Sequence, residues 1–450
     1  MSSLLAVALL VAAGLPLSYS LTRTIPLALV FAPVAGAAVA TAAILLMLAA
    51  GGPLLAWFAP VYLLTGFLAW RLRRAGPAPH GSWLDGALLT VPLLPPLLQI
   101  FQQPLLWDAH LIWWLHAGYF AEGGSFARDS VGNPALIFSH PDYPPLASAP
   151  VALAWRVLDL RDFYPAAMVN GALTLSSIAA VVYAVRRVTS AAPAVWSWLA
   201  AIAVGWSAWS PLWIVPTAGF SDAMCATAFA AGAVLLLFDR EPFDRRRLPL
   251  TLLLLCCAAL MKNEGQSMVV VLAVVATLRH RRQLRRVAWV WLPVAVAALW
   301  SLVARLLGAQ TDVLAGGHFG DLLHGDPTIA GRIPTVFSTM AGRVDRVVVL
   351  ALAAAVLGAV LLRRRRAAFG LGADPWLWAV TAGYWLAVAL IYVVTPNDLH
   401  WHLSTSVDRV MVAVVVLSCA STACWAVVAL SPGHLLGASR EAVHPDAGVQ

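Results

Sequence analysis

Long apolar segments separated by short polar ones dominate this sequence, and they decide what the chain can fold into. A helix needs about 20 apolar residues to cross the hydrocarbon core of a membrane. Of the 450 residues, 61% are hydrophobic and only 11% are charged, and the mean hydropathy is +0.81. A water-soluble protein cannot bury that much apolar surface, so the sequence predicts an all-α polytopic membrane protein.

The candidate spans are apolar segments of membrane-crossing length, at residues 3–20, 25–49, 53–70, 83–103, 165–184, 194–210, 220–238, 287–305, 346–362, 375–394 and 408–430. Two shorter apolar stretches, 248–261 and 266–278, flank the sequence KNEG. At about 1.5 Å rise per residue each reaches only about 20 Å, so we expect a shallow hairpin with its tip in the outer half of the membrane. About 13 transmembrane segments result.

Arginine clusters orient these spans. Of 28 arginines, 18 lie in five stretches that each follow an apolar segment, at 71–74, 186–187, 239–247, 279–286 and 363–366. This is the positive-inside pattern, and it also accounts for the basic pI without a nucleic-acid partner. We therefore predict a multi-pass protein of the cell inner membrane, with its N-terminus outside and its C-terminus inside. The loops 104–164, 211–219, 306–345 and 395–407 would lie outside.

The chain divides into N-terminal transmembrane segments (1–82), a transmembrane core (83–430) and a tail (431–450) that we expect to be disordered and cytoplasmic. Residues 144–160 are apolar enough to suggest a span, but they begin with two prolines. A crossing there would also place Arg186 and Arg187 outside. An interfacial helix on the outer surface satisfies both observations.

The external loop 104–164 concentrates polar and aromatic side chains. It contains WDAHLIWWLHAGYF (107–120), where Asp108 precedes a helical pattern that includes Trp113 and His116. Asp108 is either the N-cap of an interfacial helix or a catalytic carboxylate. Trp113 and Trp114 fit an aromatic belt at the membrane surface, or a wall against which a substrate stacks.

The sequence HPDYPP (140–145) contains three prolines, which fix φ and exclude a helix, so we expect a rigid extended loop. It is either a plain connector or a device that holds His140, Asp142 and Tyr143 toward a site beside Asp108.

Lys262 is the only lysine of the chain and lies in KNEG with Asn263 and Glu264. It is either a snorkelling side chain paired with Glu264 or an intramembrane cation with a function. We expect Lys262, Asn263 and Glu264 to line a water-filled cavity.

The stretch TPNDLHWHLSTSVDRV (395–410) places His400, His402 and Arg409 at the outer mouth of the last span. Arg409 either caps that span or binds a phosphate, whose oxygens a guanidinium matches geometrically. No spacing here is that of a zinc site, so we predict no protein-bound metal, although a divalent metal stays possible.

Taken in order, these features resemble the membrane glycosyltransferases of the GT-C fold, such as protein O-mannosyltransferases. The sequences WDAHLIWWLHA, HPDYPPL, MKNEG and DLHWHLSTSVDR carry the resemblance, which runs from about residue 83 to 430. They are similar to bacterial proteins of the dolichyl-phosphate-mannose type. The resemblance implies a polyprenyl-phosphate-linked sugar as donor and an acidic catalytic residue in the first external loop, where Asp108 stands. HPDYPP is similar to an HPP-type motif with Asp-Tyr inserted, which adds Asp142 as a second acid.

The residues fit this chemistry. A polyprenyl phosphate is a good leaving group, so the reaction needs a base for the acceptor hydroxyl and cations for the departing phosphate. Asp108 would be the general base, with Asp142 as a second catalytic acid, and Lys262 and Arg409 would bind the phosphate. The substrate-binding residues would be Trp113, Trp114, His116, His140, Tyr143, Asn263, Glu264, His400 and His402.

We therefore expect an inverting glycosyltransferase, a hexosyl- or pentosyltransferase without a cofactor. Its active site would face the periplasm, and the acceptor would be a glycan, lipid or protein of the cell envelope. The alternative is a transporter or lipid flippase with a broken-helix site at Lys262–Glu264.

Overall fold

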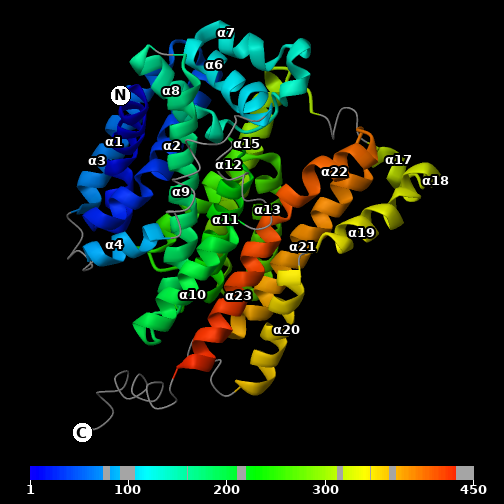
Figure 1. The fold of residues 1–450 in the computed structure, drawn as a ribbon. Coiled ribbons are helices and arrows are strands. Elements are labelled where there is room, and N and C mark those ends of the chain that lie inside the picture. The colour runs from blue at the N-terminus through cyan, green and yellow to red at the C-terminus, as the bar shows by residue number, and fades with distance from the viewer. Residues whose placement is uncertain are drawn as a thin grey trace.

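The computed structural model describes residues 1–73, 82–91, 107–159, 161–209, 219–311, 318–344, 346–363 and 371–431. Within these ranges the chain is helical and contains no β-strand (Figure 1). The prediction of an all-α membrane protein is therefore confirmed at that level.

Seven helical segments of the described chain are long and apolar enough to cross a membrane. They are α1 (Ser2–Thr22), α2 (Ile25–Ala50), α3 (Leu54–Arg73), α9 (Phe163–Val188), Arg281–Leu306 with α15 (Leu292–Leu306), α21 (Asp374–Val393), and Leu399–Leu430 with α22 (Leu399–Val410) and α23 (Val412–Leu430). An eighth candidate joins Pro327–Gly342 to α20 (Arg346–Leu361) across a bend of 77°. The count of 13 spans stays a prediction.

Shorter apolar helices occupy other predicted spans: α10 (Ala194–Ser207), α11 (Asp222–Phe238) and α12 (Leu248–Met261). Of the predicted span 83–103, only α4 (Trp83–Thr90) is described apart from Val91, and the rest lies outside the described residues. Residues 432–450 of the predicted tail and most of the loop 211–219 also lie outside them.

The centre of the bundle is α11, whose residues are all buried. It packs against α9 on one side and α12 on another, and α9 in turn packs against α1, α2 and α10. Ser176 of α9 donates a hydrogen bond to the Val30 carbonyl of α2 at 2.7 Å. The first two helices are thus part of the same core as the rest of the chain.

Helices α12 and α13 (Asn263–Arg279) form a hairpin that turns at Lys262, whose backbone is extended. The turn is tight, because a Cβ atom on Gly265 would lie 1.9 Å from the Ala258 carbonyl oxygen. At the far end of α13, the His280 ring packs edge-on against Phe243 at 5.0 Å, beside the start of α12. The chain therefore runs up α12 and back down α13, as the KNEG sequence predicts, although α13 is longer than the expected 13-residue segment.

The predicted external segment, described here from residue 107 to 159, folds into short helices at one end of the bundle (Figure 1). A π-helical turn, Ala109–Trp114, continues into α6 (Leu115–Glu122) and α7 (Gly124–Val131), and residues 144–160 form α8 (Ala149–Leu158). Ten residues of α8 rise only about 15 Å, too little for a crossing.

The expectation of an extended HPDYPP loop was wrong. His140 has a left-handed backbone, with φ 52°, and the Tyr143 N–H donates to the His140 carbonyl at 2.8 Å. The segment is a tight turn, because the prolines exclude a helix but leave His140 free to reverse the chain.

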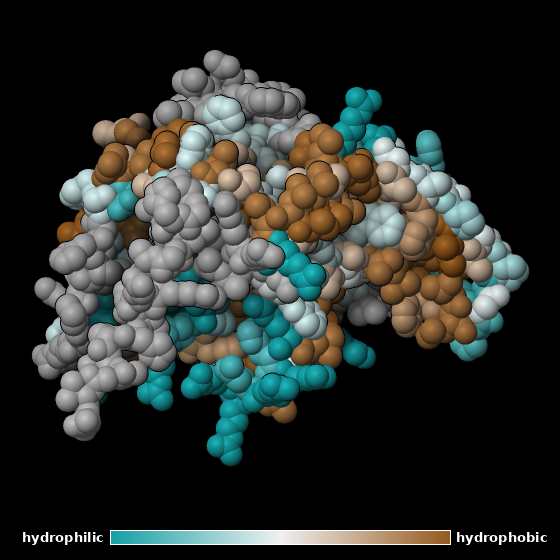
Figure 2. All heavy atoms as spheres, turned by 90° about the horizontal axis from the view of Figure 1, so that it is seen from below, coloured by the Kyte–Doolittle hydropathy of each residue, from teal (hydrophilic) through white to brown (hydrophobic). Residues whose placement is uncertain are grey.

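The described arginines of the predicted cytoplasmic stretches lie toward the opposite end of the bundle. Arg187 and Arg247 share the Asp239 carboxylate, at 3.3 and 3.0 Å, where α9, α11 and α12 meet. Figure 2 looks onto this end and shows hydrophilic side chains between hydrophobic surfaces.

Candidate functional site

Asp108 and Arg409 form an ion pair between the first external segment and the last span. The Arg409 guanidinium donates to the Asp108 carboxylate at 2.5 Å, and the two side chains are 18% and 16% exposed. Asp108 stands at the N-cap position of its π-helical turn, yet its carboxylate makes no cap hydrogen bond. The capping alternative is therefore not observed for Asp108. Arg409 lies in the last turn of α22, and its guanidinium carbon is 4.6 Å from the Phe220 ring centre.

Lys262 occupies the break between α12 and α13 and is held by two carboxylates. Its Nζ lies 2.8 Å from Asp222 and 3.1 Å from Glu264. Only 5% of the lysine side chain is exposed, so it does not snorkel toward water. A buried lysine needs such partners, because an uncompensated charge at this depth is costly.

These three ion pairs belong to one group of side chains, which we call the charged cluster: Asp108, Asp222, Lys262, Glu264 and Arg409. Asp222, beside Lys262, also interacts electrostatically with Arg409. Tyr143 interacts with both Asp108 and Lys262. The structure thus brings together Asp108, Lys262 and Arg409, which the sequence selects from three distant segments.

Asp222 is the member of the cluster that sequence reasoning missed. It starts α11, which the sequence shows only as an apolar span, 220–238. A lone acid inside such a segment is itself a signal, because ionisable residues in spans are rare and face partners. Its partner follows only from the antiparallel packing of α11 and α12.

The HPDYPP turn is fixed against the hairpin. Asn263 donates to the Asp142 carboxylate at 2.7 Å, and Trp300 of α15 donates to the Asp142 backbone carbonyl at 2.7 Å. Asp142 therefore points toward the KNEG break, and its contacts suit a positioning role.

Tyr143 fills the space between the turn and the cluster. Its ring stacks on Trp113 at 5.6 Å and on His140 at 4.8 Å, and Lys262 Nζ lies 6.0 Å from its centre. Burial, together with the nearby Glu264 carboxylate, raises the pKa of the Tyr143 phenol well above its ordinary value. Tyr143 is thus a neutral wall of the cluster.

The expected substrate residues of the external helix are buried. Trp113 and Trp114 are each 1% exposed, with ring faces occupied by Tyr143 and by Phe163 at 5.4 Å. His116 is fully buried near the Ser139 hydroxyl, at 3.4 Å, and burial lowers its pKa to about 3. These three residues belong to the packed core beneath the HPDYPP turn.

His400 and His402 lie on α22, the helix that carries Arg409. His400 is exposed, whereas His402 shares a hydrogen bond with Thr395 at 2.8 Å and packs on Tyr392 at 4.8 Å. His402 and Arg409 are two turns apart and so share one face of α22.

Three polar atoms of the charged cluster are buried without a hydrogen-bond partner among the described residues. They are Asp222 Oδ2, Glu264 Oε2 and Arg409 Nε. Buried polar groups are normally satisfied, so unsatisfied atoms on three converging side chains favour a site that receives a polar ligand. In the part of the chain that the structure describes, no three His, Cys, Asp or Glu side chains gather as metal ligands would.

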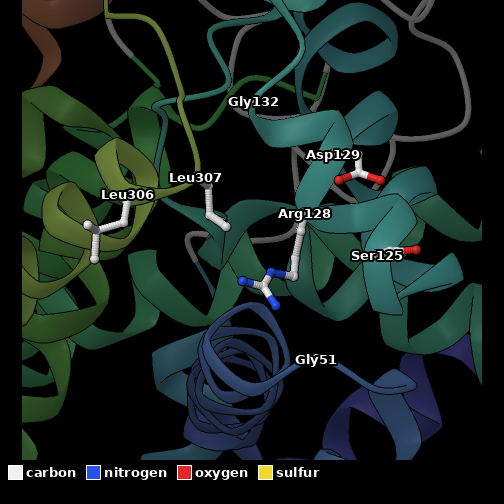
Figure 3. Close-up of a pocket in the computed structure, with 7 residues that line it drawn as sticks. All are labelled: Gly51, Ser125, Arg128, Asp129, Gly132, Leu306 and Leu307. Carbon is white, nitrogen blue, oxygen red and sulfur yellow. The ribbon is translucent and has the colours of Figure 1, made fainter.

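A separate hollow of about 650 Å³ lies on the external segment, between α7 and the ends of α2 and α15 (Figure 3). Arg128 points toward the end of α2, whereas Asp129 points away from it. None of its lining residues belongs to the charged cluster.

Comparisons of the chain with family models, with curated proteins and with solved structures found no match.

Proposed function

We propose that the chain is an inverting glycosyltransferase of the GT-C type, which moves a sugar from a polyprenyl-phosphate carrier to an acceptor at the external face of the inner membrane. The observation that carries the proposal is the pairing of Asp108 with Arg409 in a cluster with unsatisfied polar atoms. A base and a phosphate-binding cation are the two groups that this reaction needs.

Asp108 and Arg409 bind each other in this structure. A carboxylate bound to a guanidinium is a poor base, and a guanidinium bound to a carboxylate is not open to phosphate. Donor phosphate oxygens would replace Asp108 on Arg409, whose unpartnered Nε offers a further N–H. Donor binding would thereby release Asp108 for catalysis.

Transfer then follows as a direct displacement. Asp108 accepts the proton of the acceptor hydroxyl while the acceptor oxygen forms a bond to the anomeric carbon. The bond from that carbon to the phosphate oxygen breaks, and the polyprenyl phosphate leaves with the electron pair, stabilised by Arg409. Attack opposite to the leaving group inverts the configuration of the sugar.

Lys262 supports Arg409 through Asp222. Its ammonium neutralises Asp222 at 2.8 Å, and Asp222 also interacts with Arg409. If Lys262 were uncharged, Asp222 would compete with the donor phosphate for Arg409. Lys262 thus acts on the phosphate mainly by holding that carboxylate.

The external loop around α17 (Phe319–Leu323), α18 (Pro327–Ala330) and α19 (Arg332–Gly342) suits the acceptor side. Arg332 donates to the Thr395 carbonyl at 2.8 Å, and Arg343 pairs with Asp408, next to Arg409, at 3.0 Å. This anchoring supports a role for the loop in selecting a glycan, lipid or protein acceptor.

The proposal is tested by Asp108→Asn in the purified full-length protein, with a polyprenyl-phosphate sugar as donor. Loss of the base should lower the transfer rate about 10²–10⁴-fold. The matched control is Glu122→Gln, which removes an exposed carboxylate of the same segment that pairs with the exposed Arg161. Transfer by Asp108→Asn at the rate of the control would refute Asp108 as base.

A transporter or lipid flippase is the second candidate, favoured by one observation: a buried lysine between two carboxylates at a helix break. Counterflow of a labelled polyprenyl phosphate in proteoliposomes, with no covalent product and with loss of counterflow in Lys262→Met, would favour this function over transfer.

A further inference from the structure

A hollow of about 770 Å³ lies at the arginine-rich end of the bundle. It is enclosed by the end of α1, the start of α2, α4, the ends of α9 and α11, and the start of α12. The 17 residues of α11 span about 25 Å, so this hollow lies on the other side of the molecule from the charged cluster. It belongs to the end seen in Figure 2.

The lining of this hollow carries more positive than negative charge. Five arginines and three aspartates line it, and the aspartates are engaged locally. Asp239 is shared by Arg187 and Arg247, and Asp85 is held by the capping residue Ser82 and also interacts electrostatically with Arg186. Asp244 accepts a hydrogen bond from the backbone N–H of Arg246 at 2.8 Å.

Three guanidinium groups of the lining therefore have no carboxylate in an ion pair among the described residues: Arg23, Arg186 and Arg246. Arg186 is held in place, since it donates to the Ser197 hydroxyl at 3.2 Å and lies 5.4 Å from the Trp198 ring centre. Its charge is only half-buried, so a ligand reaches it without unfolding the site.

Three of the residues that line this hollow also carry a buried polar atom without a partner. Within the described chain, Arg23 Nη1, Arg186 Nε and Thr24 Oγ1 make no hydrogen bond. Donors that converge on one space and lack acceptors match a ligand with several acceptor oxygens. A phosphate group is such a ligand, and guanidinium is the side chain best shaped for it.

The remaining wall is apolar. Five leucines line the hollow beside the arginines: Leu21, Leu27, Leu89, Leu235 and Leu250. A free phosphate would gain nothing from contact with these leucines, whereas the glycerol and first acyl carbons of a lipid would pack against them. Basic pockets between transmembrane helices on the cytoplasmic side are known to hold anionic headgroups. We propose that this hollow binds the phosphate of an anionic membrane lipid, independently of the proposed transferase activity.

The test is native mass spectrometry of the full-length protein, titrated with phosphatidylglycerol. Arg246→Gln is the principal variant, because the Arg246 side chain is exposed and its replacement should leave the fold intact. Arg245→Gln is the matched control, an exposed neighbour in the same turn that does not line the hollow. Arg246→Gln should weaken lipid binding about tenfold, as expected for one charge-assisted hydrogen bond, and Arg245→Gln should not.

Two further measurements decide the source of the phosphate. Arg186→Gln, checked for folding by gel filtration, should weaken phosphatidylglycerol binding further when combined with Arg246→Gln. Phosphatidylcholine and pyrophosphate form the comparison arms. Equal retention of both lipids, or equal lipid binding by Arg246→Gln and Arg245→Gln, would overturn the proposal. Tight pyrophosphate binding without a preference between the lipids would replace it with a site for a soluble phosphate.

Discussion

The Arg409 guanidinium donates to the Asp108 carboxylate at 2.5 Å across 301 positions of sequence. This pair joins the first external segment to the last transmembrane helix, and it closes the charged cluster on that side. In the proposed reaction the pair must separate before either residue can act, so it sets the order in which substrates bind.

Replacing Asp108 should have opposite effects on binding and on transfer. Asp108→Asn removes the group that competes with donor phosphate for Arg409, so donor affinity should rise about tenfold while transfer falls. Arg409→Gln should weaken donor binding by a similar factor. Titration calorimetry with a polyprenyl phosphate measures the affinity of both variants. A drop in affinity in Asp108→Asn would contradict competition for Arg409.

Lys262→Met should destabilise the protein by about 3–5 kcal/mol, because the buried Asp222 carboxylate would lose its cation. Adding Asp222→Asn should restore part of that loss, because it removes the more deeply buried of the two carboxylates that Lys262 neutralises and leaves only Glu264 without its cation. Denaturation of the detergent-solubilised protein measures both variants. If Lys262→Met were as stable as the wild type, no buried ion pair would hold the hairpin.

Gly265→Ala tests the tight turn of the α12–α13 hairpin. The new methyl group would lie 1.9 Å from the Ala258 carbonyl oxygen, so the backbone must shift, at a cost of about 1–3 kcal/mol. Gly66→Ala is the control, because nothing lies within 4 Å of the added Cβ. Equal melting temperatures for the two variants would rule out the close approach.

His116 should make the external segment sensitive to acid. Burial lowers its pKa from 6.5 to about 3, so the stabilisation is complete above pH 6.5 and is lost as the pH falls toward 3. At about pH 5 the loss should be about 2 kcal/mol, and His116→Gln should abolish this part of the pH dependence. Thermal melts at pH 5 and 8 measure it, with exposed His400→Gln as the control. An unchanged pH dependence in His116→Gln would contradict the burial argument.

Hydropathy was sufficient to predict an all-α membrane protein and to place its long apolar helices. The break at Lys262 was also predictable, because two apolar stretches too short to cross flank a lone lysine. These features depend on local composition and on length, which one sequence records directly.

Contacts between distant segments were harder to predict. Trp113 and Trp114 look alike in sequence whether they form a surface belt or a packed floor, and only the fold shows that Tyr143 and Phe163 cover them. The turn at His140 escaped prediction because proline excludes a helix without choosing between an extended chain and a reversal. Predicting Asp222 as the partner of Lys262 required knowing which helix packs beside α12.

Asp142 is fastened twice, by Asn263 at the tip of the hairpin and by Trp300 of α15. The surface turn, the hairpin and α15 are therefore coupled as a single rigid block. In the proposed reaction, room for a lipid-linked sugar would therefore have to be made by α22, the helix that carries Arg409 on the other side of the charged cluster.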